Sequence, residues 1–275
     1  MACRRSLRAL GWAQALLAVV VIPTAVPAQS PSFLFTVSPG SAAGTPTHFV
    51  HADVGYAERV FSAIGAERME QRLGGQFGFG DRFTLLGQAG YASCTDSLKS
   101  SVEARTELLA NLFDRSARKV FAVGLGVGRE RSRQMVALGR VVGGYRSDRW
   151  EAIGNLRLER VAGRDAALAG RDGIDVITTA GATHRLGSIV RLGIEAVAED
   201  IEGFVEKNEA EGGAKLMVGP TVVLAPTGAR WNLLLGGGVV TQLTSSTRSA
   251  VTGGALRDLQ TRNGYVLRTS VAYRW

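Results

Sequence analysis

The sequence predicts an all-β fold, a transmembrane antiparallel up-and-down β-barrel of about 12 strands, with about 10 or 14 as the counting alternatives. Three observations predict it. Apolar and polar residues alternate with a period of two along most of the chain from residue 48 onward. The connections between these stretches mostly alternate between short and long along the chain. After residue 28 no apolar run reaches the length of a membrane-spanning helix, so strands would have to cross the bilayer.

The first 28 residues predict a secretory signal peptide. Three arginines precede an apolar run at 9–22, and VPA at 26–28 supplies a small-residue cleavage site. Cleavage before Gln29 would remove those three arginines and no acid, which lowers the formal net charge from +8 to +5. Cys94 would then be the single cysteine of the mature chain, which excludes an intramolecular disulfide.

Residues 29–47 predict an N-terminal linker before the barrel domain at 48–275. Within the linker, SFLFTV at 32–37 would add a short strand or a plug contact. The following SPGSAAGTPT at 38–47 has the glycine, proline and serine content of a loop.

Period-two alternation predicts strands of about ten residues or slightly more, which is the length of a tilted strand that crosses a bilayer. The predicted strands lie near 48–60, 67–79, 83–93, 101–112, 119–130, 134–145, 150–161, 174–184, 189–199, 214–224, 231–242 and 264–275. FTLLGQAGY at 83–91 shows the pattern well, because every second residue from its first phenylalanine to its tyrosine is apolar or aromatic.

Charges of both signs occupy the face opposite the apolar one, and this polar face is the predicted lumen. The predicted lumen-lining charged residues are Arg68, Glu70, Arg72, Glu103, Arg105, Glu107, Glu151, Arg157, Glu159, Arg191, Glu195 and Arg268. Charges at two-residue spacing on one face can pair along and across strands. The strands near 119–130 and 231–242 instead place small residues inward, including Gly236, which would leave room for a solute or for long arginines.

Tight turns rich in Gly, Asp and Ser join alternate pairs of strands, near 79–83, 114–118, 147–149, 186–188 and 226–230. The intervening links at 94–100, 162–173, 200–213 and 243–263 are longer, although the link at 62–66 is short. Outer-membrane barrels have short periplasmic turns, longer external loops and, with an even strand number, both ends in the periplasm.

Aromatic residues gather at the predicted strand ends, where the membrane–water boundary would lie. The predicted aromatic girdle consists of Phe79, Phe83, Tyr91, Tyr145, Trp150, Trp231, Tyr265 and Trp275. Of these, Tyr91 and Tyr265 fall at external strand ends and the others at periplasmic ends. The pattern therefore predicts two aromatic belts.

The last strand, GYVLRTSVAYRW at 264–275, alternates throughout and ends on Trp275. It resembles the closing strand of Gram-negative outer-membrane β-barrel proteins, and the resemblance extends over nearly all of 48–275. The resemblance implies a bacterial cell outer-membrane location and contact with outer-membrane lipid. It also implies recognition of this strand by the barrel-assembly machinery, followed by pairing with the first strand to remove the open edges.

The favoured function is a narrow passive channel for small solutes through a mixed-charge lumen, because the predicted strand number lies between filled barrels and wide aqueous channels. One alternative is a closed structural or adhesive barrel, with internal ion pairs that fix the strand register and external recognition loops at 200–213 and 243–263. An outer-membrane lipid- or peptide-modifying enzyme is less favoured. A soluble β-sandwich would have to bury the aromatic strand ends.

Catalysis, cofactors, metals and nucleic acid are not expected. The histidines His48, His51 and His184 fall at predicted periplasmic strand ends, whereas catalytic constellations in barrel enzymes would be expected near the external rim. The sequence shows no His, Cys or carboxylate cluster with ligand spacing. It also shows no lysine stripe with interleaved aromatics.

Overall fold

The structure, a computed structural model, describes residues 31–39, 48–61, 63–80, 82–93, 101–113, 118–129, 135–162, 174–199, 214–226, 228–244 and 263–275. The strands are β1 (His48–Glu58), β2 (Arg68–Phe79), β3 (Phe83–Ser93), β4 (Ser101–Asn111), β5 (Lys119–Arg129), β6 (Met135–Arg146), β7 (Trp150–Ala162), β8 (Asp175–Arg185), β9 (Val190–Glu199), β10 (Lys215–Leu224), β11 (Trp231–Gln242) and β12 (Gly264–Arg274). No helix among the described residues is long and apolar enough to span a membrane. The predicted signal peptide, Cys94 and most of the two long loops lie outside the described residues.

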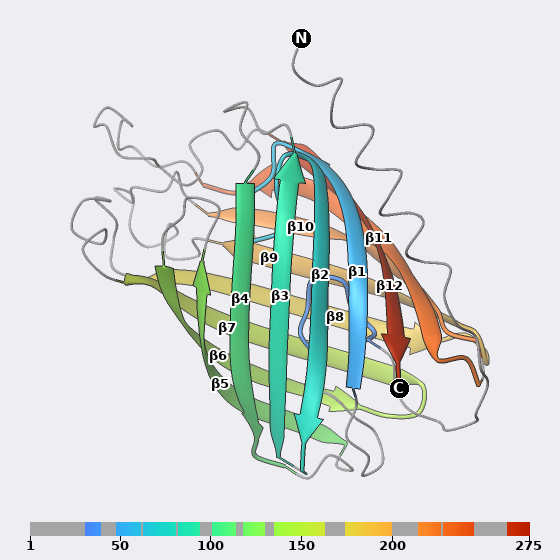
Figure 1. Ribbon diagram of the computed structural model, residues 1–275. Coiled ribbons are helices and arrows are strands. Elements are labelled where there is room, and N and C mark those ends of the chain that lie inside the picture. The colour runs from blue at the N-terminus through green and yellow to red at the C-terminus, as the bar shows by residue number, and fades with distance from the viewer. Residues whose placement is uncertain are drawn as a thin grey trace, which may run out of the picture.

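These strands close into one antiparallel barrel in which each pairs with its sequence neighbours and β1 pairs with β12 (Figure 1). The predicted fold and strand number are confirmed. The β1–β12 register runs from Phe49 opposite Arg274 to Glu58 opposite Tyr265. The Trp275 amide also donates to the His48 carbonyl at 3.4 Å. The last strand is therefore held by the first, and the sheet has no open edge.

The barrel has two unlike ends. The turn end carries the short connections, such as those between β2 and β3 and between β6 and β7, together with the start of β1 and the end of β12. The loop end carries the remaining connections, beginning with that between β1 and β2. In the predicted orientation the turn end faces the periplasm.

Strand side chains alternate between the lumen and the outside, as the sequence pattern predicts. In β7 every second residue from Glu151 to Val161 is buried, and the residues between them are exposed apart from the half-buried Gly154. Apolar side chains dominate the exposed face, for example Leu125 at 77% and Leu73 at 65% exposure. All eight predicted girdle aromatics lie on this face with 40% to 54% exposure. Such an apolar outer surface is typical of barrels that span a lipid bilayer.

The strand β10 contains a proline, which is unusual in a strand with neighbours on both sides. Pro220 has no N–H to donate, and the β10–β11 pairing skips from Val218 opposite Val239 to Thr221 opposite Gly236. Close backbone approach accompanies this gap, since a Cβ on Gly219 would lie 1.8 Å from the Gly237 carbonyl oxygen. Glycines at these positions therefore allow the two strands to stay adjacent across the interruption.

The lumen is not polar along its whole length, although charges of both signs line much of it. Near the loop end, β8 to β12 point apolar side chains inward, and the connection from β1 to β2 packs on them through Phe61 and Ile64. Both side chains are fully buried, at 0% exposure. The inward side chains of this cluster are Ile177, Val197, Met217, Val240 and Val266. Apolar contact at this end thus draws the β1–β2 connection into the barrel.

Candidate functional site in the barrel lumen

The structure buries most of the charged residues predicted to line the lumen. The buried ones are Glu70, Arg72, Glu107, Glu151, Arg157, Glu159, Arg191, Glu195 and Arg268. Glu103 and Arg105 are partly buried. Arg68 is exposed as the first residue of β2 and has a φ of 65°. Arg68 is therefore not among the buried lumen charges, because it lies at the loop end, where β2 begins.

One ion-pair group joins β2, β4 and β12. Arg72 Nε lies 3.0 Å from Glu70 Oε1 and 3.4 Å from Glu103 Oε1. Arg268 Nη2 lies 3.4 Å from Glu70 Oε2 and also donates to the Ile64 carbonyl. Arg268 therefore connects the strand network to the β1–β2 connection that covers the loop end.

A second ion-pair group joins β4, β6 and β7. Arg140 donates to both carboxylate oxygens of Glu107, at 2.6 and 2.8 Å, and to Asn155 Oδ1 at 3.1 Å. Arg157 Nε lies 2.7 Å from Glu159 Oε1 within β7. A bidentate arginine–carboxylate pair with both members buried is a strong, geometrically fixed contact. This group fixes the positions of neighbouring arginines on the lumen wall.

Arg105 on β4 stands between these two groups. Its guanidinium donates to the neutral Gln88 amide oxygen of β3 at 3.1 Å from Nε and 2.6 Å from Nη2. Its electrostatic surroundings include Arg157 and Arg72 as well as Glu103. Three arginines, from β2, β4 and β7, therefore lie near one another in the lumen.

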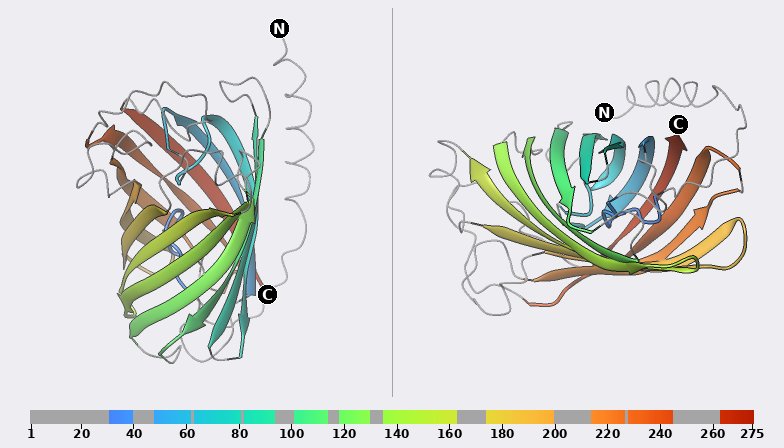
Figure 2. Two further views of the ribbon diagram at one scale, coloured as in Figure 1. Left: turned by 90° about the vertical axis from the view of Figure 1, so that its left-hand side faces the viewer. Right: turned by 90° about the horizontal axis from the view of Figure 1, so that it is seen from below.

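The N-terminal segment, defined here as residues 31–39, lies inside the lumen (Figures 1 and 2). Glu195 of β9 holds its middle part. The backbone amides of Leu34, Phe35 and Thr36 donate to the Glu195 carboxylate at 2.9, 2.8 and 3.0 Å. The Thr221 hydroxyl of β10 donates to the same carboxylate at 2.6 Å. This part of the predicted linker is therefore part of the barrel interior.

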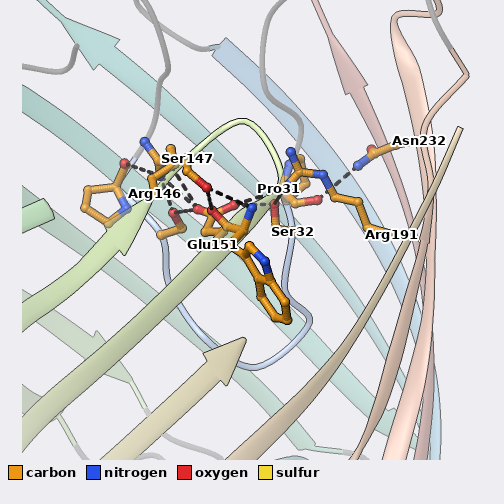
Figure 3. Close-up of polar contacts among 10 residues, drawn as sticks. Pro31, Ser32, Arg146, Ser147, Glu151, Arg191 and Asn232 are labelled. Carbon is orange, nitrogen blue, oxygen red and sulfur yellow. Dashed lines mark hydrogen bonds and ion pairs between the residues drawn. The ribbon is translucent and has the colours of Figure 1, made fainter. Parts of the chain in front are cut away.

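Glu151 of β7 holds both flanks of the N-terminal segment (Figure 3). The Ser32 hydroxyl donates to Glu151 Oε2 at 2.6 Å, and the Ser38 hydroxyl donates to Oε1 at 2.7 Å. Arg146 Nη2 lies 2.9 Å from Oε1, and Arg191 Nη1 lies 3.5 Å from Oε2. One carboxylate therefore closes the segment into a loop at its base.

Aromatic side chains of the N-terminal segment pack on the wall. Phe33 forms an apolar cluster with inward residues of β5 to β7, including Val142 and Ile153. Phe35 contacts the loop-end apolar cluster, and the Arg268 guanidinium carbon lies 4.6 Å from its ring centroid. The segment is thus fixed by apolar as well as polar contacts.

A cavity of about 140 Å³ remains beside the N-terminal segment, bordered mainly by β1 to β4 and β12. Among the described residues its charged lining comprises five arginines and two carboxylates. The arginines are Arg72, Arg105, Arg140, Arg157 and Arg268, and the carboxylates are Asp53 and Glu107. The same cavity is lined by Gln76, Gln88 and Ser270, so hydrogen-bonding groups alternate with the charges.

The histidines make structural contacts. His48 stacks on Trp275 with ring centroids 6.3 Å apart, and the His184 ring centroid lies 4.3 Å from that of Trp150. His51 Nδ1 lies 2.9 Å from Asp53 Oδ1 on the lumen wall. Within the described ranges no group of three or more His, Cys, Asp or Glu residues could hold a metal ion.

The sequence predicted Glu151 and Glu195 as lumen charges and SFLFTV at 32–37 as a short strand or plug contact, but it did not link them to one another. It placed Ser38 in a loop and gave no role to Asn232, whose side-chain amide donates to the Pro31 carbonyl at 3.1 Å.

No family model and no curated protein matches the sequence. Among solved structures the chain is similar to the NanC porin, with a TM-score of 0.58 and 10% identity over 82% of this chain and 100% of that one. The chain has the fold of an outer-membrane channel. The KdgM porin, in complex with disordered oligogalacturonate, gives a TM-score of 0.54 and 10% identity over 82% of this chain and 99% of that one. An outer membrane channel from Pseudomonas putida F1 gives a TM-score of 0.52 and 11% identity over 87% of this chain and 100% of that one. This fold and the exposed apolar belt agree with the predicted outer-membrane location.

Proposed function

We propose that this protein is a passive outer-membrane channel for small solutes, with a preference for anions. The observation that carries the proposal is the basic lining of the cavity in the lumen. Five arginines against two carboxylates leave a formal excess of three positive charges among the described lining residues. A cavity of about 140 Å³ is close in size to an engineered protein cavity of about 150 Å³ that binds benzene. Small solutes therefore suit it.

The carboxylates that partner these arginines are mostly set back from the cavity. Glu70 and Glu159 pair with Arg268 and Arg157, yet neither carboxylate lines the cavity. The arginines therefore present cationic edges to the passage while their charge is balanced from behind. In surroundings of low dielectric constant such a wall attracts anions more strongly than it would in water.

A solved relative in fold points to the same solute chemistry. The KdgM porin was solved with oligogalacturonate, a sugar chain that carries carboxylates. An arginine-lined passage in the present chain would accept the same charge sign through guanidinium–carboxylate hydrogen bonds. The likeness supports the class of solute, and the arginines of this chain supply the physical reason.

The test is the reversal potential of the purified protein in a planar bilayer under a KCl gradient. Conductance steps with a reversal potential on the anion-selective side are expected. Arg105→Gln should move the reversal potential toward zero, because it removes a lining charge that is hydrogen-bonded to neutral Gln88. Arg160→Gln is the matched control, since it makes the same change on the exposed face of β7. Equal shifts in both variants would contradict the proposal.

The closed structural or adhesive barrel is the second candidate. The observation that favours it is the amount of chain inside the lumen, namely the N-terminal segment and the buried Phe61 and Ile64. Under this candidate, folded protein would give no conductance steps. The external loops proposed for recognition lie mostly outside the described residues.

A further inference from the structure

The N-terminal segment is bound to the lumen wall at several independent points. Its contacts reach β7 through Glu151, β9 through Glu195 and β11 through Asn232. The Asn155 side chain of β7 additionally donates to the Val37 carbonyl at 3.0 Å. Contacts to three strands across the barrel fix the segment within the cross-section of the lumen, where it is visible inside the sheet in two perpendicular views (Figures 1 and 2).

Glu195 is satisfied by the N-terminal segment itself. Its side chain is buried at 1% exposure, and it accepts hydrogen bonds from three consecutive backbone amides and from Thr221. A buried carboxylate is costly unless hydrogen bonds replace the lost water. Three of those four bonds would vanish if the segment left the lumen. The carboxylate therefore stabilises the inserted position of the segment.

The barrel wall is shaped to receive the side chains of the N-terminal segment. A Cβ added at Gly181 of β8 would lie 2.5 Å from Phe33 Cδ1, and one added at Gly236 of β11 would lie 2.8 Å from Leu34 Cδ1. Both distances are too short for real carbon atoms. These inward glycines thus accommodate the segment, which is a different use from the solute or arginine space predicted for Gly236.

We infer that the N-terminal segment is a built-in constriction that sets the size limit of the channel. The segment contacts the wall from β5 to β11, with Phe35 reaching Arg268 of β12, and the cavity lies between the segment and the wall formed mainly by β1 to β4 and β12. Solutes would pass along this basic wall. This inference rests on the proposed channel function, because a constriction limits the size of the solutes that cross the lumen.

The test compares conductance and size exclusion of neutral polyethylene glycols in bilayers for three folded variants. They are a deletion of residues 31–39, Glu195→Ala and the control Glu159→Ala. The control removes a buried lumen carboxylate of the same size that pairs with Arg157. Folding of each is first established by heat-modifiable gel migration. Neutral polymers separate the size of the passage from its charge.

The deletion and Glu195→Ala are expected to admit larger polymers and to show at least roughly twofold higher conductance, because pore diameter limits permeation. Glu159→Ala should keep the wild-type size limit. If the folded deletion variant kept the wild-type size limit, the constriction would be overturned. The channel function would still stand in that case, provided that the wild type conducts. Conductance in the deletion but silence in the wild type would support the constriction and refute passive passage in the intact protein. Silence in both would overturn both.

Discussion

Glu195 shows how the chemistry of one side chain can be predicted while its partner cannot. Its position in an alternating stretch predicts a lumen-facing charge that can pair along or across strands. The structure instead supplies backbone amides from residues about 160 positions earlier in the chain. Burial forces a carboxylate to find donors, and it does not specify which donors.

The pair formed by Glu107 and Arg140 yields a stability prediction. Both side chains are nearly inaccessible, with 4% and 3% exposure, and they share two hydrogen bonds. Glu107→Ala should lower the free energy of unfolding by about 3–5 kcal/mol, because it leaves a buried guanidinium without its main partner. Urea-induced unfolding in lipid vesicles measures this loss.

The double variant Glu107→Ala with Arg140→Met is the control for that prediction. It removes both charges and fills part of the space with an apolar chain, so it should be more stable than the single variant. If the double variant were less stable than Glu107→Ala, the uncompensated charge would not explain the stability lost in Glu107→Ala. That loss would then come from lost packing volume.

The strands and the N-terminal segment differ in how far local sequence specifies them. Alternation fixes the twelve strands to within about two residues, since one face must be apolar wherever lipid lies outside. The inserted segment has no period, and its place depends on Glu151 and Glu195 on distant strands. The apolar layer formed with Phe61 and Ile64 was missed for the same reason.

The closing strand yields a prediction about assembly. Trp275 stacks on His48, and its ring centroid lies 5.9 Å from that of Phe77 on β2. Deletion of Trp275 should reduce the amount of folded barrel in the outer membrane several-fold, because the contact that joins the last strand to the first is weakened at the turn end. The fraction of heat-modifiable protein in membrane preparations measures this effect.

Trp150→Ala is the control for the assembly prediction. Trp150 is an exposed girdle residue of β7 with 53% exposure, close to the 54% of Trp275. It lies in the interior of the sequence, so its removal should leave most of the folded fraction intact. A folded fraction in the Trp275 deletion equal to that of the wild type would show that the aromatic end is dispensable for assembly.

The charge that lines the cavity differs from the mixed charge predicted for the lumen as a whole. The sequence predicts a mixed-charge lumen, with both signs on the inward face. In three dimensions five arginines line the cavity, whereas Glu159 and Glu70, which pair with Arg157 and Arg268, do not. The presence of both signs on the inward face therefore does not determine the electrostatic potential in the cavity, because that potential depends on the groups that line it.

Salt dependence tests this difference. The anion preference should be strong at about 0.1 M KCl and weaker at about 1 M, because the Debye length shrinks from about 10 Å to about 3 Å. Reversal potentials at a constant concentration ratio measure it. A permeability ratio that does not change with salt would mean that ions are selected by direct contact and not by the potential of the arginine wall.

The sequence by itself determined the barrel, its strand number, the girdle and the inward direction of most charges, because lipid outside and polar groups inside impose a period of two that any single strand displays. Only the tertiary structure decided that residues 31–39 enter the lumen, that Glu151 and Glu195 hold them, and that arginines dominate the remaining cavity. Those features join residues from strands on different sides of the barrel. Contacts between segments that far apart in the chain leave no periodic trace in the sequence, so closure of the barrel had to bring them together.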